Sequence, residues 1–457
     1  MCIAFQCIRQ KEKSRNNGTF YKFALKRKRD KLRGSCSVER RRFRVALKIS
    51  MMLRSSSSFF IVSALCCLAI AGAAIFLAMA GGSNYLGSLD FRVYLTAGKM
   101  ALDGTGAKFY DLPTQFATQS HLWPQMTRQS QLLPFLAPPF VGVLFAPLAL
   151  LSPLQGYVVW TSCNAALLWL LARGALDEIE LDGRQKLVAL ALLLTFTPAL
   201  FAVMQGQVSL FVVFAFFQSW KAAKSGRDWQ AGIWFSVLLI RPQLVFIPVL
   251  ILMWKGRWKL LGGLASGAAV LGLVSLFLVG WHGLKNYANL LGAVSTWQNI
   301  YGVQPQQMQT YRGFLHALLN TNFVSDVHIP WLMGIAFAVA LLFWCWRGSW
   351  NREAARFDRQ WAALGIVALF CCPYLYSHDL SLLSVCGVLI FRAARLEKSR
   401  LVVLPAAGYG VVLLWAISLA VLPRTLPWVA LFEGAAIGML AWSDRERQNR
   451  QMEMVFP

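Results

Sequence analysis

Four short polar motifs interrupt apolar stretches of the chain, and they carry residue types that can exchange protons and bind charged groups. The motifs are Asp90-Phe-Arg-Val-Tyr94, Gln205-Gly-Gln207, Arg241-Pro-Gln243 and Tyr376-Ser-His-Asp379. Irregular polar backbone between apolar segments is tolerated only where it lines a cavity or is buried in protein. Ionisable groups in such surroundings are functional by default, because burying an uncompensated charge is costly. We therefore expect a cavity with a carboxylate, an arginine and a histidine at its rim.

Each motif also has a structural alternative. Asp90 starts an amphipathic stretch, where it would cap a helix that lies at an interface. Arg241 would be a cation that snorkels to a polar surface, His378 would belong to a capped hairpin turn, and Gln207 would be a turn residue. Glu433 lies inside the last apolar segment, where we expect it to pair with a buried partner.

The elements that must position these motifs are apolar. Of the 457 residues, 57% are hydrophobic and 14% are charged, against about 25% charged residues in ordinary soluble domains. The mean hydropathy is +0.50. This composition excludes an ordinary soluble enzyme and predicts an all-α polytopic membrane protein. In a soluble protein, the net charge of +25 would suggest binding to nucleic acid. Here the basic residues gather in the first residues and in short connections between apolar segments, so we expect no nucleic-acid partner.

The first residues form a basic head, because 17 of the 45 basic residues fall within residues 1–54. We expect residues 1–56 to be disordered or to lie on an anionic leaflet on the cytoplasmic side. Met51-Met52 before an apolar run is the alternative start, which would make the head an extension of the gene model. Residues 57–443 are expected to form the membrane-embedded domain, and residues 444–457 a cytoplasmic tail.

Apolar segments suited to helices alternate with connections of very different charge. Five short connections hold 17 basic residues in 45 positions, whereas the long connections 81–136 and 281–329 hold six in 105. The positive-inside rule places the short connections in the cytoplasm and the long ones outside. The short basic connections are 221–229, 255–259, 347–360, 392–400 and 443–450. The apolar segments are 58–80, 138–151, 153–173, 187–204, 207–220, 230–240, 242–254, 260–280, 330–346, 361–375, 379–392, 401–422 and 425–442.

Counting crossings between these loops predicts about twelve spans with both termini inside. An odd number of membrane crossings must separate the outer 81–136 loop from the inner 221–229 loop, yet four apolar segments lie between them. The weakest is 138–151, which three prolines break, so we expect it to lie in the outer interface. The loop 175–186 is then predicted to lie in the cytoplasm, although its four acidic and two basic residues do not favour that side. All four polar motifs face outward.

The 281–329 connection interleaves aromatic residues with amides, among them Trp297, Tyr301 and Gln304. Such a surface suits sugar rings, whose flat faces stack on aromatic rings while their hydroxyls bind amides. Trp and Tyr also gather at any membrane interface, so the pattern alone identifies no ligand.

Several short motifs follow one another along the chain. They are Asp90-Phe-x-x-Tyr94, Leu-Asp-Gly104, Phe109-Tyr110-Asp111, Pro138-Pro139-Phe, Phe145-Ala-Pro147-Leu, Gly206-Gln207, Arg241-Pro242-Gln243 and Pro373-Tyr-x-x-Ser-His378-Asp379. In this order they resemble glycosyltransferase family 87 over about residues 60–440. Where that family commonly has Tyr-Pro-Pro, this chain has Ala137-Pro138-Pro139.

The resemblance implies a GT-C fold with interfacial helices in the first outer loop. It also implies inverting transfer of a hexose, mannose in the family pattern, from a polyprenyl-phosphate-linked sugar to a lipid or glycan acceptor. Asp90 would take the proton of the acceptor hydroxyl. Arg241 and His378 would neutralise the leaving phosphate, with Arg92 and Arg312 behind them. The implied donor-phosphate site also includes Gln207, Tyr94 and Asp379.

The resemblance implies no metal and no cofactor, and the chain has neither an Asp-x-Asp motif nor a glycine-rich phosphate loop. We expect a multi-pass protein of a bacterial inner membrane whose site faces the periplasm, with membrane lipids around it. Two other functions stay open. A transporter or lipid flippase fits twelve spans, although the two halves show no inverted repeat. A ligase or polymerase that uses lipid-diphosphate-linked glycans has a similar helical outline.

Overall fold

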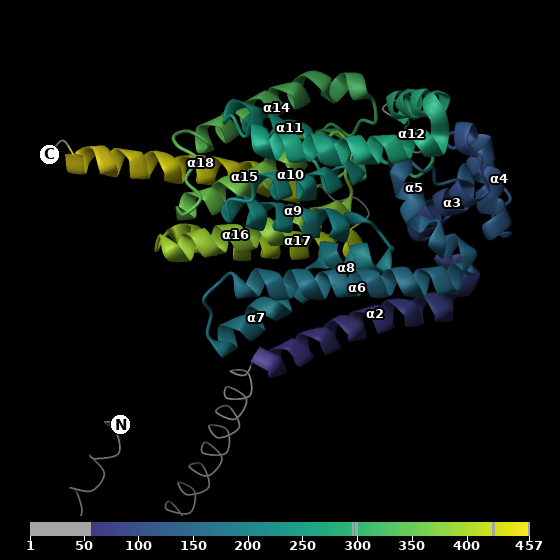
Figure 1. The fold of residues 1–457 in the computed structure, drawn as a ribbon, viewed down its shortest axis with the longest axis horizontal. Helices are drawn as coiled ribbons and strands as arrows, with labels where there is room; N and C mark the ends of the chain where they lie inside the picture. The colour runs from purple at the N-terminus through teal and green to yellow at the C-terminus, as the bar shows by residue number, and fades with distance from the viewer. Residues whose placement is uncertain (1–55, 295–296, 298–299, 423–425, 456–457) are drawn as a thin grey trace, which may run out of the picture. The chain divides into compact units, whose positions relative to one another are not determined.

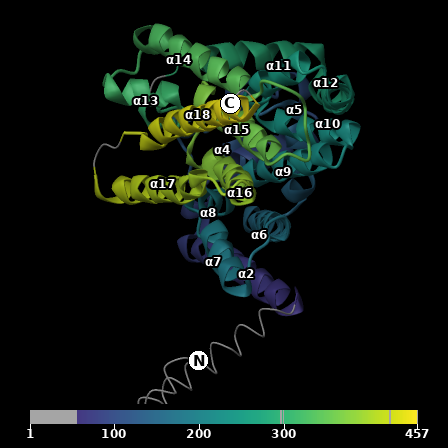
Figure 2. The same cartoon turned by 90° about the vertical axis from the view of Figure 1, so that its left-hand side faces the viewer.

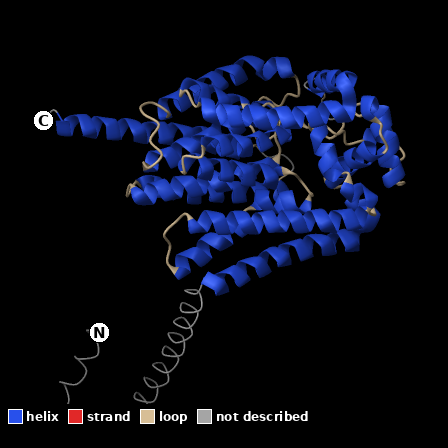
Figure 3. Ribbon diagram, viewed as in Figure 1, coloured by secondary structure: helices blue, strands red, loops and turns tan. Residues whose placement is uncertain are grey.

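The computed structural model describes residues 56–294, 297, 300–422 and 426–455. The chain divides into residues 1–61 and residues 62–457, and every contact given below lies within the second unit. The predicted basic head lies outside the described residues except for Ser56. Within the described residues every regular element is a helix (Figure 3), which confirms the prediction of an all-α protein.

The elements have the following bounds. The α-helices are α2 (Ser56–Leu86), α3 (Phe91–Leu102), α4 (Leu112–Leu122), α5 (Pro139–Phe145), α6 (Pro153–Asp177), α7 (Gly183–Leu194), α8 (Thr197–Met204), α9 (Ser209–Lys224), α10 (Asp228–Ser236), α11 (Phe246–Trp254), α12 (Trp258–Val294), α13 (Tyr311–Leu318), α14 (Val324–Cys345), α15 (Ala355–Cys371), α16 (Leu382–Leu396), α17 (Leu404–Val421) and α18 (Trp428–Val455). The short 3₁₀ helices are η1 (Gly106–Lys108), η2 (Gln129–Gln131), η3 (Pro147–Leu150), η4 (Val237–Ile240), η5 (Pro242–Leu244), η6 (Pro305–Gln307), η7 (Ser377–Ser381) and η8 (Arg400–Val403).

Several helices are long and apolar enough to cross a membrane by length and composition. In the described residues there are five, or six if α7 and α8, which meet at an angle of 50°, form one span. The chain is therefore an all-helical membrane protein, whereas the twelve crossings and the GT-C arrangement stay predictions. The five are Ile61–Leu86, Pro153–Asp177, Trp258–Val294, Val324–Cys345 and Arg400–Leu419.

Glycine and proline break the helices near the places where the sequence predicts short segments. The predicted interfacial segment 138–151 is the short pair α5 and η3, which Pro147 separates. The predicted segment 260–280 ends at a break in α12, and the first part of the predicted connection 281–329 is the helical continuation of α12 to Val294. Gly280 has φ 64°, a left-handed conformation that glycine adopts without strain.

α15 forms the centre of the helical packing. Its residues from Phe357 to Cys371 are all buried, and it packs against α14, α16 and α18. A helix that is apolar nearly all round is stable only when other helices surround it. The predicted segment 361–375 therefore corresponds to an interior helix that starts earlier, at Ala355, and ends earlier, at Cys371. The loop that follows it carries His378 into the interior.

The basic connections meet at one end of the helices. In Figure 1, α18 runs out at this end, and α3, α4 and α5 gather at the other; Figure 2 views the basic end. The basic connections 221–229, 255–259 and 347–360 therefore share one end with the 175–186 loop, as the count of crossings predicted. Three contacts join the loops: Lys255 Nζ donates to Gly348 O at 2.8 Å, Arg352 pairs with Asp228 at 2.6 Å, and Lys221 pairs with Glu178 at 2.8 Å.

Candidate active site

Asp90 lies in the turn between α2 and α3. It occupies the N-cap position of α3, but its side chain makes no capping hydrogen bond. Instead, its Oδ2 accepts a hydrogen bond of 2.6 Å from Gln207 Nε2. Its backbone N–H donates to Gln205 Oε1 at 3.2 Å, and the Phe91 N–H donates to the Gln205 carbonyl at 2.8 Å. The capping alternative is therefore wrong, because the carboxylate points to a residue 117 positions away.

The Gln205-Gly206-Gln207 turn holds this arrangement in place. Gly206 has φ +64°, and a Cβ there would lie 2.7 Å from Phe91 Cβ, so only glycine fits. Gln207 Oε1 accepts hydrogen bonds from Tyr94 Oη at 2.6 Å and from Arg241 Nη2 at 3.1 Å. Because two donors face Oε1, the amide nitrogen must face Asp90. Gln207 thus links the carboxylate of Asp90 to the guanidinium of Arg241.

Arg241 occupies the break between η4 and η5. Pro242 cannot donate a backbone hydrogen bond, so the helix is interrupted there and the arginine turns inward. Its Nε lies 3.2 Å from Asp379 Oδ1, and its Nη2 lies 3.3 Å from His378 Nε2. The side chain is only 16% exposed. It does not run out to a polar surface, so the snorkelling alternative is wrong.

His378 and Asp379 belong to η7, which follows the buried helix α15. His378 lies between the two carboxylates, with Nδ1 3.9 Å from Asp90 Oδ2 and Nε2 3.3 Å from Asp379 Oδ2. Asp379 Oδ1 also accepts a 2.7 Å hydrogen bond from Ser209 Oγ. These bonds make the loop more than a capped turn, since both side chains contact residues of other elements.

The candidate site is a cavity of about 110 Å³. The two carboxylates differ in access: the Asp90 side chain is 34% exposed, whereas that of Asp379 is 5% exposed. Asp90 is therefore the carboxylate that an incoming molecule can reach. The residues that line the cavity are Asp90, Val93, Tyr94, Leu133, Pro134, Phe135, Leu136, Ala137, Gln207, Arg241, Tyr301, Gly302, Tyr374, Tyr376, His378 and Asp379.

The structure brings six of the eight predicted site residues to this cavity. Arg92 and Arg312 do not line it. Arg92 Nη2 donates to the Gln131 carbonyl at 3.0 Å. The guanidinium of Arg312 lies 5.4 Å from the centre of the Trp331 ring. Both arginines thus contact groups outside the cavity.

Two residues of the cavity wall, Tyr374 and Tyr376, were noted in the motifs but not predicted as site residues. Tyr376 is the first residue of the motif that holds His378, and it packs edge to face with Tyr374 at 5.2 Å. Tyr376 Oη donates to the Gly302 carbonyl at 3.2 Å, which ties η7 to the loop that carries Tyr301. The available signal was the position of these two tyrosines, one inside the polar motif and one two residues before it. Only part of the predicted aromatic connection therefore reaches the site.

The prediction that Glu433 pairs with a buried partner is wrong for the described residues. It is fully buried on α18 and does not line the cavity, and neither of its carboxyl oxygens has a hydrogen-bond partner in the part of the chain that the structure describes. The expected buried partner is therefore absent from the described residues.

Gln207→Leu is expected to lower kcat by about 10- to 100-fold, because a hydrogen bond to a charged group is worth about 1.5–3 kcal/mol. Leucine cannot hold the Asp90 carboxylate or the Arg241 guanidinium. Initial-rate measurements on purified variants check this. Gln243→Leu is the matched control, since Gln243 does not line the cavity and its Nε2 donates to the Tyr374 carbonyl at 3.4 Å. An equal loss in both variants would contradict the positioning role of Gln207.

Asp379 provides a prediction on pH. Burial alone would raise the pKa of its carboxyl, but the Arg241 guanidinium, His378 and the Ser209 hydroxyl outweigh burial and hold that pKa well below its usual range. A carboxyl with a lowered folded pKa contributes stability above its unfolded pKa of about 3.9 and loses it only below. Asp379→Asn should therefore destabilise by a constant amount from pH 5 to 8, about 3–5 kcal/mol for a broken buried pair. Unfolding curves across that range measure it, and a difference that shrinks toward pH 5 would contradict it.

Comparison with known proteins gives one result. The family model of glycosyltransferase family 87 matches residues 135–373. The matched segment includes Gln207 and Arg241, whereas Asp90 lies 45 residues before it and His378 five residues after it. No curated protein and no solved structure matches the chain. Within the described residues, no group of three or more His, Cys, Asp or Glu side chains is placed to hold a metal ion.

Proposed function

Because the chain belongs to glycosyltransferase family 87, a membrane glycosyltransferase, we propose that it transfers a hexose, specifically mannose, from a polyprenyl-phosphate-linked sugar. The proposed acceptor is a hydroxyl of a lipid or glycan. The observation that carries the proposal is the arrangement of one accessible carboxylate, Asp90, beside the Arg241 guanidinium and the His378 imidazole. Inverting transfer from a phosphate needs a base and a cation on opposite sides of one reacting carbon.

The proposed reaction is a single displacement. The acceptor oxygen attacks the anomeric carbon of the sugar, and the new carbon–oxygen bond forms as the bond from that carbon to the phosphate oxygen breaks. Asp90 takes the proton of the acceptor hydroxyl. Polyprenyl phosphate leaves with the electron pair of the broken bond, and Arg241 and His378 stabilise its negative charge.

Asp379 supports the cation in this proposal. It contacts both Arg241 and His378, and Ser209 fixes one of its oxygens. An arginine held by a buried carboxylate loses little freedom when it binds phosphate, so it is preorganised for the transition state. Tyr94 keeps Gln207 in place through its hydroxyl, and burial raises the pKa of Tyr94 to about 12. Tyr94 therefore acts as a neutral hydrogen-bond donor.

The proposed orientation places the site outside the cytoplasm. The basic loops meet at the end of the helices opposite to α3 and α5, and basic loops stay on the cytoplasmic side. The site would then face the periplasm of a bacterial inner membrane, with both termini in the cytoplasm. A lipid-linked donor is too apolar to leave the bilayer, so its headgroup would meet the site at the outer interface.

The test of the proposed function is a transfer assay. Membranes that overexpress the protein, supplied with radiolabelled polyprenyl-phosphate mannose, should move label into a lipid or glycan product. Transfer from a polyprenyl-diphosphate-linked glycan instead would favour the ligase or polymerase. Solute accumulation in vesicles without any lipid-linked sugar would favour the transporter. Either of these results without mannose transfer would contradict the proposal.

A further inference from the structure

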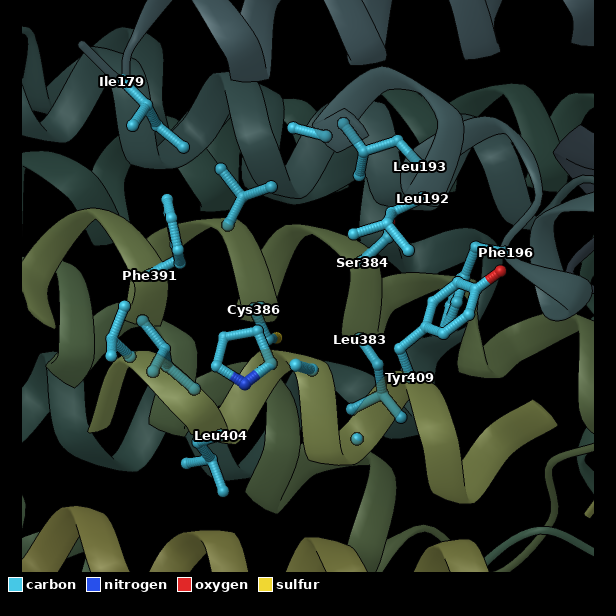
Figure 4. Close-up of a pocket in the computed structure, with 18 of the residues that line it drawn as sticks. Ile179, Leu192, Leu193, Phe196, Leu383, Ser384, Cys386, Phe391, Leu404 and Tyr409 are labelled. Atoms are coloured by element: carbon cyan, nitrogen blue, oxygen red, sulfur yellow. The ribbon is translucent and has the colours of Figure 1, made fainter. Parts of the chain in front are cut away.

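A second, larger cavity lies among α7, α16, α17 and α18, and it shares no residue with the candidate active site. Its volume is about 460 Å³, within the range of roughly 300–1,000 Å³ of typical ligand pockets. In Figure 4, Leu193 of α7, Cys386 of α16 and Leu404 of α17 border this space. Most of the lining is aliphatic or aromatic, so the body of the cavity suits a hydrocarbon chain.

Polar residues line only a small part of this cavity. Arg184 and Arg395 are both exposed, and Gln185 Oε1 accepts a 3.2 Å hydrogen bond from Arg395 Nη1. Among the residues that the structure describes, neither arginine has a carboxylate partner. The nearby Asp182 caps α7 by accepting a 2.8 Å hydrogen bond from the Gln185 N–H. Arg184 and Arg395 are therefore two cations without a carboxylate partner in the described residues, at the exposed edge of the cavity.

These cations lie at the end of the molecule that carries the basic loops. Arg392, one turn before Arg395 on α16, donates through Nε to the Glu178 carbonyl at 2.7 Å, and Glu178 pairs with Lys221. α16 begins just after Asp379 and runs for 15 residues. At 1.5 Å per residue, Arg395 lies about 20 Å from the candidate active site.

We propose that this cavity binds an anionic phospholipid of the leaflet at the basic end. One acyl chain fills the apolar space, and the phosphate contacts Arg184 and Arg395. Basic pockets between membrane helices on the cytoplasmic side suit such headgroups. Under the proposed reaction the donor phosphate lies at the other end of α16, so a different phosphate must contact Arg184 and Arg395. The cavity and its two exposed arginines are observed independently of that reaction.

Lipid titration of the purified full-length protein tests the proposal. Phosphatidylglycerol should bind more tightly than phosphatidylcholine with the same acyl chains. Native mass spectrometry measures this as the number of lipids bound per protein at each lipid concentration. Arg184→Gln with Arg395→Gln should weaken phosphatidylglycerol binding about tenfold or more, because each cation near an anionic lipid contributes roughly 1 kcal/mol. The matched control is Arg227→Gln with Lys259→Gln, two exposed cations in the basic connections that do not line the cavity. The control should bind like the wild type.

A second variant tests the apolar part of the cavity. Ala189→Trp fills the space from α7 and leaves both arginines in place, so it should weaken binding of both lipids. Unchanged phosphatidylglycerol affinity in the double arginine variant would overturn the proposal, and so would an equal loss in the control. Competition by polyprenyl phosphate at this site would also overturn it, because the cavity would then belong to the donor.

Discussion

Asp90→Asn is expected to lower the rate of sugar transfer by about 10²- to 10⁴-fold, the contribution of a well-placed general base. Asparagine has the same shape as aspartate, and its amide oxygen can still accept the hydrogen bond that Gln207 Nε2 donates. It cannot take a proton from the acceptor hydroxyl. The measurement is kcat of the purified variant at saturating donor, together with its thermal midpoint, which should match that of the wild type.

Asp103→Asn is the matched control for this variant. Asp103 lies at the opposite end of the same helix, α3, where it pairs with Lys99 at 2.5 Å on the exposed side. An exposed pair of this kind contributes little to stability, so the variant should keep full activity. Full activity in Asp90→Asn would show that a group other than Asp90 accepts the proton, even if the fold is as described.

Arg241→Lys is expected to lower kcat by about 10²- to 10³-fold, the usual cost of removing one donor from a site that stabilises developing charge. Lysine keeps the positive charge, but it lacks the planar fork of guanidinium nitrogens. It cannot contact Asp379, Gln207 and a phosphate at the same time. Steady-state kinetics should show the loss mainly in kcat, because the contact strengthens as the phosphate leaves.

Arg312→Lys is the control for Arg241→Lys. Arg312 is also largely buried, but it stacks on Trp331 and does not line the cavity. Its replacement should change kcat by less than a few-fold, even if the thermal midpoint falls. Equal losses of kcat in the two variants would mean that the effect of Arg241 is structural.

Most residues that line the candidate site could be predicted from the sequence, because each polar motif interrupts an apolar segment. Asp90, Gln207, Arg241 and His378 come from four separate segments, and sidedness alone predicted that they would meet. Proline and glycine mark the breaks, as at Pro242 and Gly206. The positive-inside count was equally informative, since the basic loops contact one another in the structure.

Other features could not be predicted, because a sequence does not give the direction of a side chain. Arg92 lies two residues after Asp90, yet on α3 it points to Gln131 and away from the cavity. Arg312 likewise depends on how α13 packs. The break at Gly280 lies at the predicted end of the segment 260–280, but nothing in the sequence analysis indicated that a helix follows it to Val294.

The most direct test of the proposed transfer is the release of polyprenyl phosphate by the purified protein in lipid vesicles. We expect polyprenyl-phosphate mannose and a hydroxyl acceptor to yield free polyprenyl phosphate and a mannosylated product in equal amounts. We expect Asp90→Asn to yield neither at a comparable rate. Transfer that proceeds from a nucleotide sugar, or at an undiminished rate in Asp90→Asn, would contradict the proposal.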